Sequence, residues 1–299
     1  MLVCIFSYNR GLFLENCVAS IENCIPGARI AIFDDNSTDE ETQAVLARLG
    51  MKHDVLQPGH SGHNRLGGLY GNMQSALEYS RDESLVCYLQ DDTQVVRQLS
   101  EGDLAEIQAL LDGDDRIGFV SPCFLRGRNK QRDAERVTFR ADKRIYVRDR
   151  GKPRVGDSFS ALHIMNPRKL IARGWSYAAK EPANDAQAKE MFGLMPYLKT
   201  PFAMWLPDVP TYRGKMKTLG LKLAEKRRQV GFYPFVTLSG DQVAGMEERP
   251  AARLPFAEDF LICRNGSPMQ PWAYHPMQDY RWLQKLSNAE LALRRWFGS

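Results

Sequence analysis

Residues 2–7 (LVCIFS), 30–39 (IAIFDDNSTD) and 85–94 (LVCYLQDDTQ) decide the fold. Each stretch is a short apolar run that passes directly into polar residues, as a buried strand does where it reaches the edge of a sheet. Segments with the helical spacing of apolar residues lie between them, for example residues 12–23. Strands that alternate with helices in this way predict a parallel sheet with helices on both faces. The sequence therefore predicts an α/β, Rossmann-like fold with a mostly parallel central sheet.

The polar segments that follow these strands are the first candidates for a site. They cover residues 7–10, 34–39 and 90–94, and two of the three are acidic. Open parallel sheets bind their ligands at the carboxyl ends of the strands. We therefore expect the three segments to meet at one edge of the sheet and to form a binding site there.

The pair Asp91 and Asp92 is the sharpest chemical signal in the sequence. Two adjacent carboxylates at the end of a buried strand cost free energy unless a cation compensates them. Oxygen ligands of this kind suit Mg²⁺ or Mn²⁺, which also keep waters and bind substrate phosphates. Many such pairs only cap a turn, so the pair alone does not decide between a metal site and a turn.

The acidic segment at residues 34–39 also has a purely structural interpretation. Thr38 and Glu41 have the spacing of a capping box, which predicts a helix that begins after Thr38. A strand-to-helix turn would explain this pattern. It does not require the two consecutive carboxylates of Asp34 and Asp35, which point to a ligand.

Composition and charge narrow the class of protein. The chain has 299 residues, of which 43% are hydrophobic and 25% are charged, values that are ordinary for a soluble globular protein. A chain of this length can bury a large core without disulfides or a structural metal. The net charge of +4 suits an anionic small molecule or a membrane surface, but it is too weak to indicate nucleic-acid binding.

Cysteine usage and the N-terminal sequence indicate a cytoplasmic protein. The six cysteines form no CxxC pair and several lie in apolar runs, so we expect reduced core residues. The first residues, MLVCIFSYNR, lack the basic region of a signal peptide. No apolar run reaches the roughly 18 residues that a membrane helix needs. Peripheral contact with the inner face of a membrane remains compatible with these features.

Residues 5–21 and 30–46 strongly resemble the opening of the family 2 glycosyltransferases, which have the GT-A fold of the nucleotide-diphospho-sugar transferases. Members run a strand into a small-polar/Tyr/Asn turn, then a helix, then a second strand that ends in Asp-Asp-x-Ser-x-Asp. Here Ser7-Tyr8-Asn9 and residues 34–39 stand at these places. The family's third landmark is a DxD-like carboxylate pair, which Gln90-Asp91-Asp92 resembles. The resemblance covers roughly the first third of the chain well and is thin afterwards.

The resemblance implies a nucleotide site that includes Ser7, Tyr8, Asn9 and Asp35. Tyr8 would pack on the base, and Asp35 would accept a hydrogen bond from a ring N–H. A carboxylate at this place resembles the uracil-reading position, which favours UDP- or dTDP-sugars as donors. The loop at residues 60–68 would add Arg65 as a nucleotide contact, with a plain surface loop as the alternative.

The resemblance also implies the metal ligands. Asp91 would approach the ribose or the metal, and Asp92 would ligate the Mn²⁺ or Mg²⁺ that bridges the two phosphates. Such a metal neutralises the charge that builds on the departing diphosphate. Many GT-A enzymes gain a late histidine ligand, but we assign that role to neither His163 nor His275.

An inverting transferase needs a general base that takes the proton from the acceptor hydroxyl. The family places a carboxylate at the start of a helix after a Gly-aromatic turn, and Asp185 matches the second acid of its Glu-Asp pair. Asn184 replaces the first acid, which is a departure from the family pattern. Glu181 is the reserve candidate. The structural alternative for Asp185 is an acidic residue favoured by the helix dipole.

For the domain organisation we expect a GT-A catalytic domain over residues 1–200 and a C-terminal extension over residues 201–299. The nucleotide-binding half would cover residues 1–95 and the acceptor half residues 96–200. Residues 213–228 hold seven basic residues and one acidic residue. They form a solvated helix face, close over the donor diphosphate, or hold the enzyme against anionic lipid or a phosphorylated acceptor.

These observations predict an inverting, metal-dependent glycosyltransferase that moves a sugar from a nucleotide-diphosphate donor to a hydroxyl acceptor. The acceptor would be a glycan, a lipid-linked glycan or another hydroxyl compound in bacterial-type glycan or polysaccharide biosynthesis. Two alternatives stay open. A metal-dependent nucleotidyltransferase would normally begin with a Gly-rich basic loop, which residues 7–11 do not form. A non-catalytic nucleotide- or glycan-binding module is the other. An NAD-binding enzyme is disfavoured because no GxGxxG follows the first strand.

Overall fold

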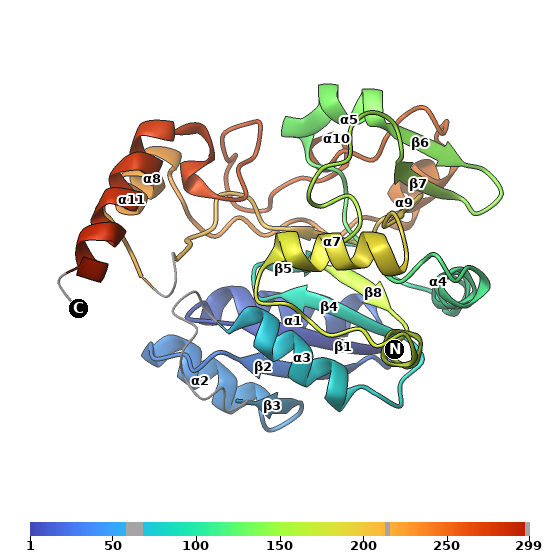
Figure 1. Cartoon of the computed structure of the whole chain (residues 1–299), viewed down its shortest axis with the longest axis horizontal. Helices are drawn as coiled ribbons and strands as arrows, with labels where there is room; N and C mark the ends of the chain where they lie inside the picture. The colour runs from blue at the N-terminus through green and yellow to red at the C-terminus, as the bar shows by residue number, and fades with distance from the viewer. Residues whose placement is uncertain (58–67, 213–215, 297–299) are drawn as a thin grey trace.

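The computed structural model describes residues 1–57, 68–212 and 216–296 (Figure 1). A five-stranded sheet forms its centre, in the order β3-β2-β1-β4-β8. The first four strands are parallel and β8 pairs antiparallel with β4. The strands are β1 (Leu2–Ser7), β2 (Arg29–Asp34), β3 (Asp54–Leu56), β4 (Val86–Gln90) and β8 (His163–Met165). The predicted α/β fold with a mostly parallel sheet is confirmed.

Helices cover both faces of this sheet, so its strands are apolar on both sides. Val3 and Ile5 of β1 belong to the same core cluster as the buried face of α1. Leu2, Cys4 and Phe6 point to the other face and share a cluster with α3. The helices of this half are α1 (Gly11–Cys24), α2 (Glu40–Leu49), α3 (Leu69–Tyr79) and α4 (Glu101–Gly113).

The expected helix start at Thr38 is wrong by one residue. Asp39 is the N-cap of α2, and its side chain accepts a hydrogen bond from the backbone N–H of Thr42 at 2.8 Å. The backbone N–H of Thr38 instead donates to Oδ1 of Asn9 at 2.7 Å. The side chain of Asn9, which follows β1, therefore binds the backbone of Thr38, and Asp39 caps the helix in its place.

A second layer lies beyond the β8 edge of the central sheet (Figure 1). It contains a small antiparallel sheet in the order β6-β7-β9 and several short helices. Helix α7 lies between this layer and the central sheet (Figure 1). The elements of this layer are η1 (Gly127–Asn129), α5 (Lys130–Arg136), β6 (Val137–Arg140), β7 (Ile145–Arg148), β9 (Tyr197–Leu198), α9 (Gly240–Glu248) and α10 (Ala257–Phe260). The helix between the layers, α7, covers Glu181–Met191. Helix α6 (Pro167–Ala172) packs against the end of α4, where Lys169 donates to the carbonyl oxygens of Leu111 and Asp114.

Packing is continuous across residue 200. Strand β10 (Ala203–Trp205) pairs antiparallel with β5 (Thr93–Val95), which directly follows the Asp91–Asp92 pair. The side-chain amide of Gln94 exchanges two 2.8 Å hydrogen bonds with the backbone of Phe235, which is fully buried. The division into domains at residue 200 stays a prediction, and residues beyond it complete the core of the part before it.

The C-terminal helices form a hairpin at the end of the molecule away from β6 and β7 (Figure 1). The hydroxyls of Thr218 and Ser287 hydrogen-bond at 2.6 Å where the helices cross. A Cβ on Gly220 would lie 2.5 Å from the carbonyl oxygen of Leu283, so only glycine permits this approach. The elements are α8 (Leu219–Arg228), η2 (Pro276–Asp279) and α11 (Arg281–Trp296).

The cysteines and the helices agree with the sequence analysis. All six cysteines are free, and five of them are buried. Across residues 1–57, 68–212 and 216–296, no helix is both long and apolar enough to cross a membrane.

Candidate functional site

The ends of β1, β2 and β4 lie side by side and bring the three polar segments together. Ser7 is in register with Asp34, and Phe6 is in register with Gln90. The first residues beyond these strands, Tyr8, Asp35 and Asp91, therefore meet at one edge of the sheet. We call the group formed by Arg10, Asp34, Asp35, Asp91 and Asp92 the acidic edge.

Asn9 connects two of the three strand ends. Its backbone has a φ of 50°, in the left-handed region that asparagine tolerates better than most residues. Its N–H donates to Oγ of Ser37 at 2.9 Å, and its Oδ1 accepts from the N–H of Thr38 at 2.7 Å. The side chain that the sequence assigned to nucleotide binding thus positions the β2–α2 turn. A contact between Asn9 and a nucleotide stays a prediction.

The two carboxylates of the β2 end have different surroundings. Asp34 is fully buried and accepts hydrogen bonds from Ser37, at 2.8 Å from the N–H and 2.5 Å from the hydroxyl. Asp35 is partly exposed, and its Oδ2 accepts the N–H of Gly68 at 2.8 Å. A Cβ on Gly68 would lie 2.2 Å from Oδ1 of Asp35, so a side chain there would displace the carboxylate. Asp34 therefore builds the turn, while Asp35 is the more accessible of the two carboxylates.

Ser7 and Tyr8 line the same edge. The Ser7 hydroxyl is buried and has no hydrogen-bond partner among the described residues. The backbone N–H of Tyr8 donates to Oδ2 of Asp91 at 2.9 Å, which fixes the Asp91 carboxylate against the β1 turn. The Tyr8 ring packs edge-on against Tyr212, with 5.4 Å between ring centroids.

Arg10 lies between the carboxylates of Asp91 and Asp92. Its Nη1 is 2.9 Å from Oδ1 of Asp91 and 2.6 Å from Oδ2 of Asp92. Both carboxylates are almost completely buried. Burial raises the pKa of Asp91, and the guanidinium of Arg10 opposes this rise. One arginine thus compensates part of the charge of an acidic pair that water does not reach.

The remaining acceptor capacity of the pair fits a divalent cation. Oδ1 of Asp92 is buried and accepts no hydrogen bond from the described residues. Among the residues that the structure describes, no third His, Cys, Asp or Glu joins the pair in a metal-ligand cluster. Mg²⁺ typically uses one or two carboxylates and completes its shell with waters and substrate phosphates. Two aspartates with one orphaned oxygen therefore meet the minimum donor set.

Helix α7 presents two carboxylates in different roles. Oδ1 of Asp185 accepts hydrogen bonds from the backbone N–H groups of Gly156, Ser158 and Phe159, at 2.9–3.0 Å, and so holds the loop before β8. Glu181, one turn earlier, lines a pocket together with residues 154–157 of that loop. Its residue is exposed, yet the surrounding protein desolvates its carboxylate and, together with Asp185, raises its pKa, while Arg126 lowers it.

His163 is a core residue. It is fully buried, and burial lowers its pKa to about 4. Its Nδ1 lies 2.7 Å from the carbonyl oxygen of Ser160, so Nδ1 carries the proton, and Nε2 lies 3.0 Å from the Tyr177 hydroxyl. A neutral ring with both nitrogens engaged belongs to the aromatic core. His275 is the N-cap of η2.

Sequence reasoning missed three residues of the site. Arg10 is a cation three residues beyond a strand end, which is a common arrangement. Its partners could not be predicted, because they lie more than 80 positions away. Tyr212 reaches Tyr8 from the segment before α8. Trp205 donates from Nε1 to Oε1 of Gln90 at 3.2 Å. The predicted contact Arg65 lies outside the described residues.

Comparison with known proteins identifies the family. The profile of Glycosyl transferase family 2 matches residues 2–165, more than half of the chain. The chain belongs to this family. The mostly parallel sheet and the C-terminal helices agree with the expected GT-A fold. No curated protein matches the sequence.

Solved structures give distant likenesses to this chain. One is S. aureus TarS residues 1–349 in complex with UDP, with a TM-score of 0.44 and 12% identity. That match covers 68% of the present chain and 59% of the TarS chain, so the chain spans less than two thirds of that structure. Another is the mannosyltransferase PcManGT from Pyrobaculum calidifontis in complex with GDP-Man and Mn²⁺, with a TM-score of 0.47 and 15% identity. It covers 100% of this chain and 75% of that one.

Proposed function

We propose that this glycosyltransferase transfers a sugar from a nucleotide-diphosphate donor, a UDP- or dTDP-sugar, to a hydroxyl acceptor with inversion. The acceptor would be a glycan, a lipid-linked glycan or a similar compound of bacterial-type glycan biosynthesis. The observation that carries the proposal is the convergence of Tyr8, Asp35, Asp91 and Asp92 at the ends of three adjacent strands. Family membership supplies the reaction class.

The nucleotide would bind along the acidic edge. Tyr8 would pack on the base and Asp35 would accept a hydrogen bond from a ring N–H, which favours uracil or thymine. The orphaned hydroxyl of Ser7 supplies a further polar group at this place. Tyr212 and Lys217 extend the site, since Tyr212 packs on Tyr8 and the Lys217 ammonium lies 4.7 Å from the Tyr212 ring. This placement favours the interpretation in which part of the basic 213–228 segment closes over the donor.

Asp92, assisted by Asp91, would hold Mn²⁺ or Mg²⁺ through its orphaned oxygen. The cation would supply charge neutralisation for the departing diphosphate. Arg10 fixes both carboxylates from the opposite side and reduces their mutual repulsion. The backbone N–H of Tyr8 also holds the carboxylate of Asp91 in place. The residues of the chain thus orient the two carboxylates before a donor arrives.

A carboxylate of α7 would take the proton from the acceptor hydroxyl. Two observations favour Glu181: it lines a pocket, and its raised pKa makes it a stronger base than an ordinary glutamate. Asp185, the residue favoured by the sequence, uses one oxygen to hold the 156–159 loop. Its other oxygen leaves it a candidate, and substitution of each residue separates the two roles.

We also propose that the α8–α11 hairpin rests on an anionic membrane from the cytoplasmic side. Four apolar residues of α11 at helical spacing are exposed by 37–84%, namely Trp282, Leu286, Leu293 and Trp296. Exposed cations lie on both helices of the hairpin, among them Lys222 and Lys226 of α8 and Arg281 and Lys285 of α11. An apolar stripe on a hairpin that also carries exposed cations matches an interfacial helix.

Vesicle flotation tests the membrane contact. The protein should float with vesicles that contain anionic lipid and not with neutral ones, and Trp282→Ser with Leu293→Ser should abolish flotation. Sedimentation gives the competing outcome. If the same double variant turns a dimer into a monomer and flotation is absent, the stripe is an interface between two copies.

The central experiment is calorimetry of UDP, dTDP, GDP and ADP, each with and without Mn²⁺, on the parent protein and on Asp92→Ala. We expect metal-dependent binding of UDP or dTDP that falls by about a hundredfold or more in the variant, because the orphaned oxygen is removed. Asp112→Ala, on the exposed side of α4, is the matched control and should bind normally. If the parent shows no metal-dependent nucleotide binding, the proposed sugar transfer is wrong, and the chain is a non-catalytic member of the family.

A further inference from the structure

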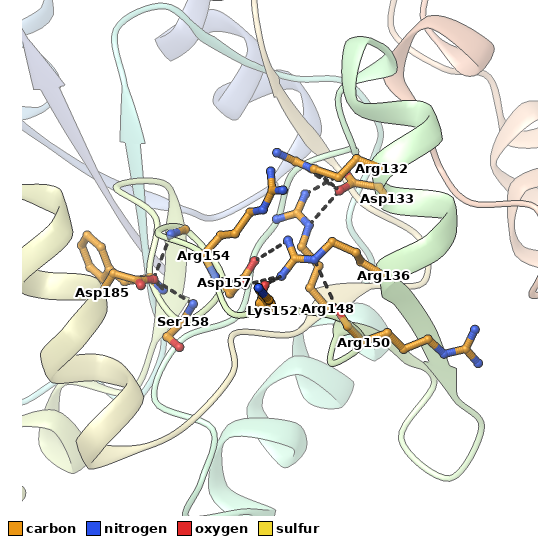
Figure 2. Close-up of polar contacts among 12 residues, drawn as sticks. Arg132, Asp133, Arg136, Arg148, Arg150, Lys152, Arg154, Asp157, Ser158 and Asp185 are labelled. Atoms are coloured by element: carbon orange, nitrogen blue, oxygen red, sulfur yellow. Dashed lines mark hydrogen bonds and ion pairs between the residues drawn. The ribbon is translucent and has the colours of Figure 1, made fainter.

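A strongly basic pocket of about 260 Å³ lies between α5, β7 and the start of α7. Its walls come from the segment after Ser121, from α5, from β7 and from the loop before β8. Five arginines line it: Arg126, Arg132, Arg136, Arg148 and Arg154. We call this cavity the arginine pocket, and Figure 2 shows four of these arginines with their partners.

Two of the five arginines belong to the framework of the pocket. Arg136 binds the carboxylate of Asp157 with both terminal nitrogens, at 2.6 and 3.3 Å. Arg148 binds the fully buried Asp133 at 3.0 and 3.3 Å. Asp185 reaches the same 152–158 loop from the opposite side (Figure 2). These pairs are satisfied, and they fix the loop that forms one wall of the pocket.

The other three arginines leave an excess of positive charge. Arg132 shares Asp133 with Arg148, at 3.1 Å. Arg154 is exposed, and the side chains of Arg126 and Arg154 form no ion pair or hydrogen bond with any described residue. Glu181 is the remaining carboxylate of the wall. Five guanidinium groups therefore face three carboxylates, counting Asp133 and Asp157.

Arg126 is held in a way that leaves its N–H groups available. Its guanidinium stacks on the ring of Trp205 at 4.4 Å and on that of Tyr274 at 4.8 Å. Stacking fixes the plane of an arginine without using its hydrogen-bond donors. The rigid donor edge of such an arginine suits two-point binding of a phosphate or carboxylate.

The arginine pocket adjoins the proposed reacting centre. Glu181, the favoured general base, forms part of its wall. Trp205, on which Arg126 stacks, donates to Gln90, and Gln90 directly precedes Asp91. An anion in the pocket would therefore lie on the α7 side of the acidic edge, where an acceptor hydroxyl would have to reach Glu181.

We propose that the arginine pocket binds an oxyanion of the acceptor, a phosphate or carboxylate group, and so selects anionic acceptors. This inference rests on the proposed glycosyltransferase function and adds the chemical class of its second substrate. Arg126 and Arg154 hold the anion, while Arg136 and Arg148 keep the pocket open. The donor diphosphate binds separately at the acidic edge.

The first test is binding of inorganic phosphate, measured by calorimetry on the parent, on Arg126→Gln and on Arg154→Gln. We expect each variant to bind phosphate about tenfold more weakly, since a hydrogen-bonded charge is lost. Arg154 is exposed, so its replacement leaves the fold intact. Arg227→Gln is the matched control, because Arg227 also stacks on a tyrosine ring, Tyr280 at 5.2 Å, but lies outside the pocket. Phosphate affinity equal in all four proteins would overturn the proposal.

The second test separates acceptor from donor. UDP binding with Mn²⁺ should be unchanged in Arg126→Gln and in Arg154→Gln, while KM for an anionic acceptor rises about tenfold. A variant that weakens UDP binding instead would assign the pocket to the donor and overturn the proposal. If no nucleotide binds to any protein while phosphate binding still depends on Arg126, the proposed function fails and the anion site stands.

Discussion

The acidic edge and the arginine pocket are both suited to binding a phosphate group, but they carry opposite charges. At the edge, several carboxylates surround one arginine, and a buried oxygen of Asp92 is left without a hydrogen bond. In the pocket, several arginines surround three carboxylates, and Arg126 is left without an ion pair among the described residues. The edge can meet a phosphate only through a bridging cation, whereas the pocket can meet one directly. The comparison teaches that one chain can offer a phosphate group two places of opposite charge, of which only one needs a cation.

The largest expected effect is that of replacing Glu181, the carboxylate in the wall of the arginine pocket. Glu181→Gln should lower kcat by about 10²–10⁴ if Glu181 is the general base. Because burial raises its pKa, kcat/KM of the parent should increase with pH through a value above that of an ordinary glutamate. This rising limb should vanish in Glu181→Gln. A stopped assay of transfer over a range of pH measures both quantities.

Asp185→Asn is the companion to that variant. It keeps the shape of the side chain and an oxygen for the N–H groups of residues 156–159. With Asp185 as loop holder, kcat should fall far less than in Glu181→Gln and the rising limb should persist. Loss of the limb in Asp185→Asn alone would reverse the assignment.

An intermediate effect is expected when the acidic edge loses its arginine. Arg10→Met should lower the free energy of unfolding by about 3–5 kcal/mol near neutral pH, because two buried carboxylates lose their partner. The folded state then holds Asp91 at a raised pKa, so it binds more protons than the unfolded state. Stability should consequently fall as pH rises above the ordinary aspartate range. Urea denaturation at about pH 5 and about pH 7.5 tests this sign.

The control for Arg10 is an exposed ion pair. Arg29 lies 3.0 Å from Glu83, and both side chains contact solvent. Arg29→Met should cost only about 0–1 kcal/mol at either pH. Equal losses for the two variants would mean that the acidic edge is not desolvated as described.

The smallest effect is expected at Tyr212. Tyr212→Ala should weaken nucleotide binding by about three- to tenfold, because the edge-on contact that orients Tyr8 is lost. Tyr212→Phe keeps the ring and removes only a 3.4 Å hydrogen bond to the carbonyl of Asn9, so its affinity should stay within about twofold. Unchanged binding in Tyr212→Ala would place the segment before α8 outside the donor site.

The sequence was sufficient for most of the acidic edge, because local patterns create it, but not for Arg10, whose partners Asp91 and Asp92 lie more than 80 positions away. Apolar runs end in polar residues at three places, and parallel register alone brings Tyr8, Asp35 and Asp91 together. It failed at Thr38, since the residue that displaces the expected cap is Asn9, 29 positions earlier. Local propensity carries no information about such a partner.

The arginine pocket could not be predicted for the same reason. Its cations are spread over residues 126–154, which read only as a charge-rich region. Whether an arginine is neutralised depends on tertiary pairing, as for Arg136 with Asp157, 21 positions away. The availability of Arg126 depends on Trp205 and Tyr274, which lie still farther along the chain.

The pairing of β5 with β10 has a consequence for the order of events during synthesis. Chains emerge from the ribosome N-terminus first. The sheet edge with Asp91 and Asp92 is translated early, but its neighbour β10 and the Phe235 backbone that engages Gln94 come much later. More than a hundred further residues must therefore be synthesised before the segments that pack around the carboxylate pair are present. A nascent chain halted near residue 200 would carry the signature of the family without a finished catalytic centre.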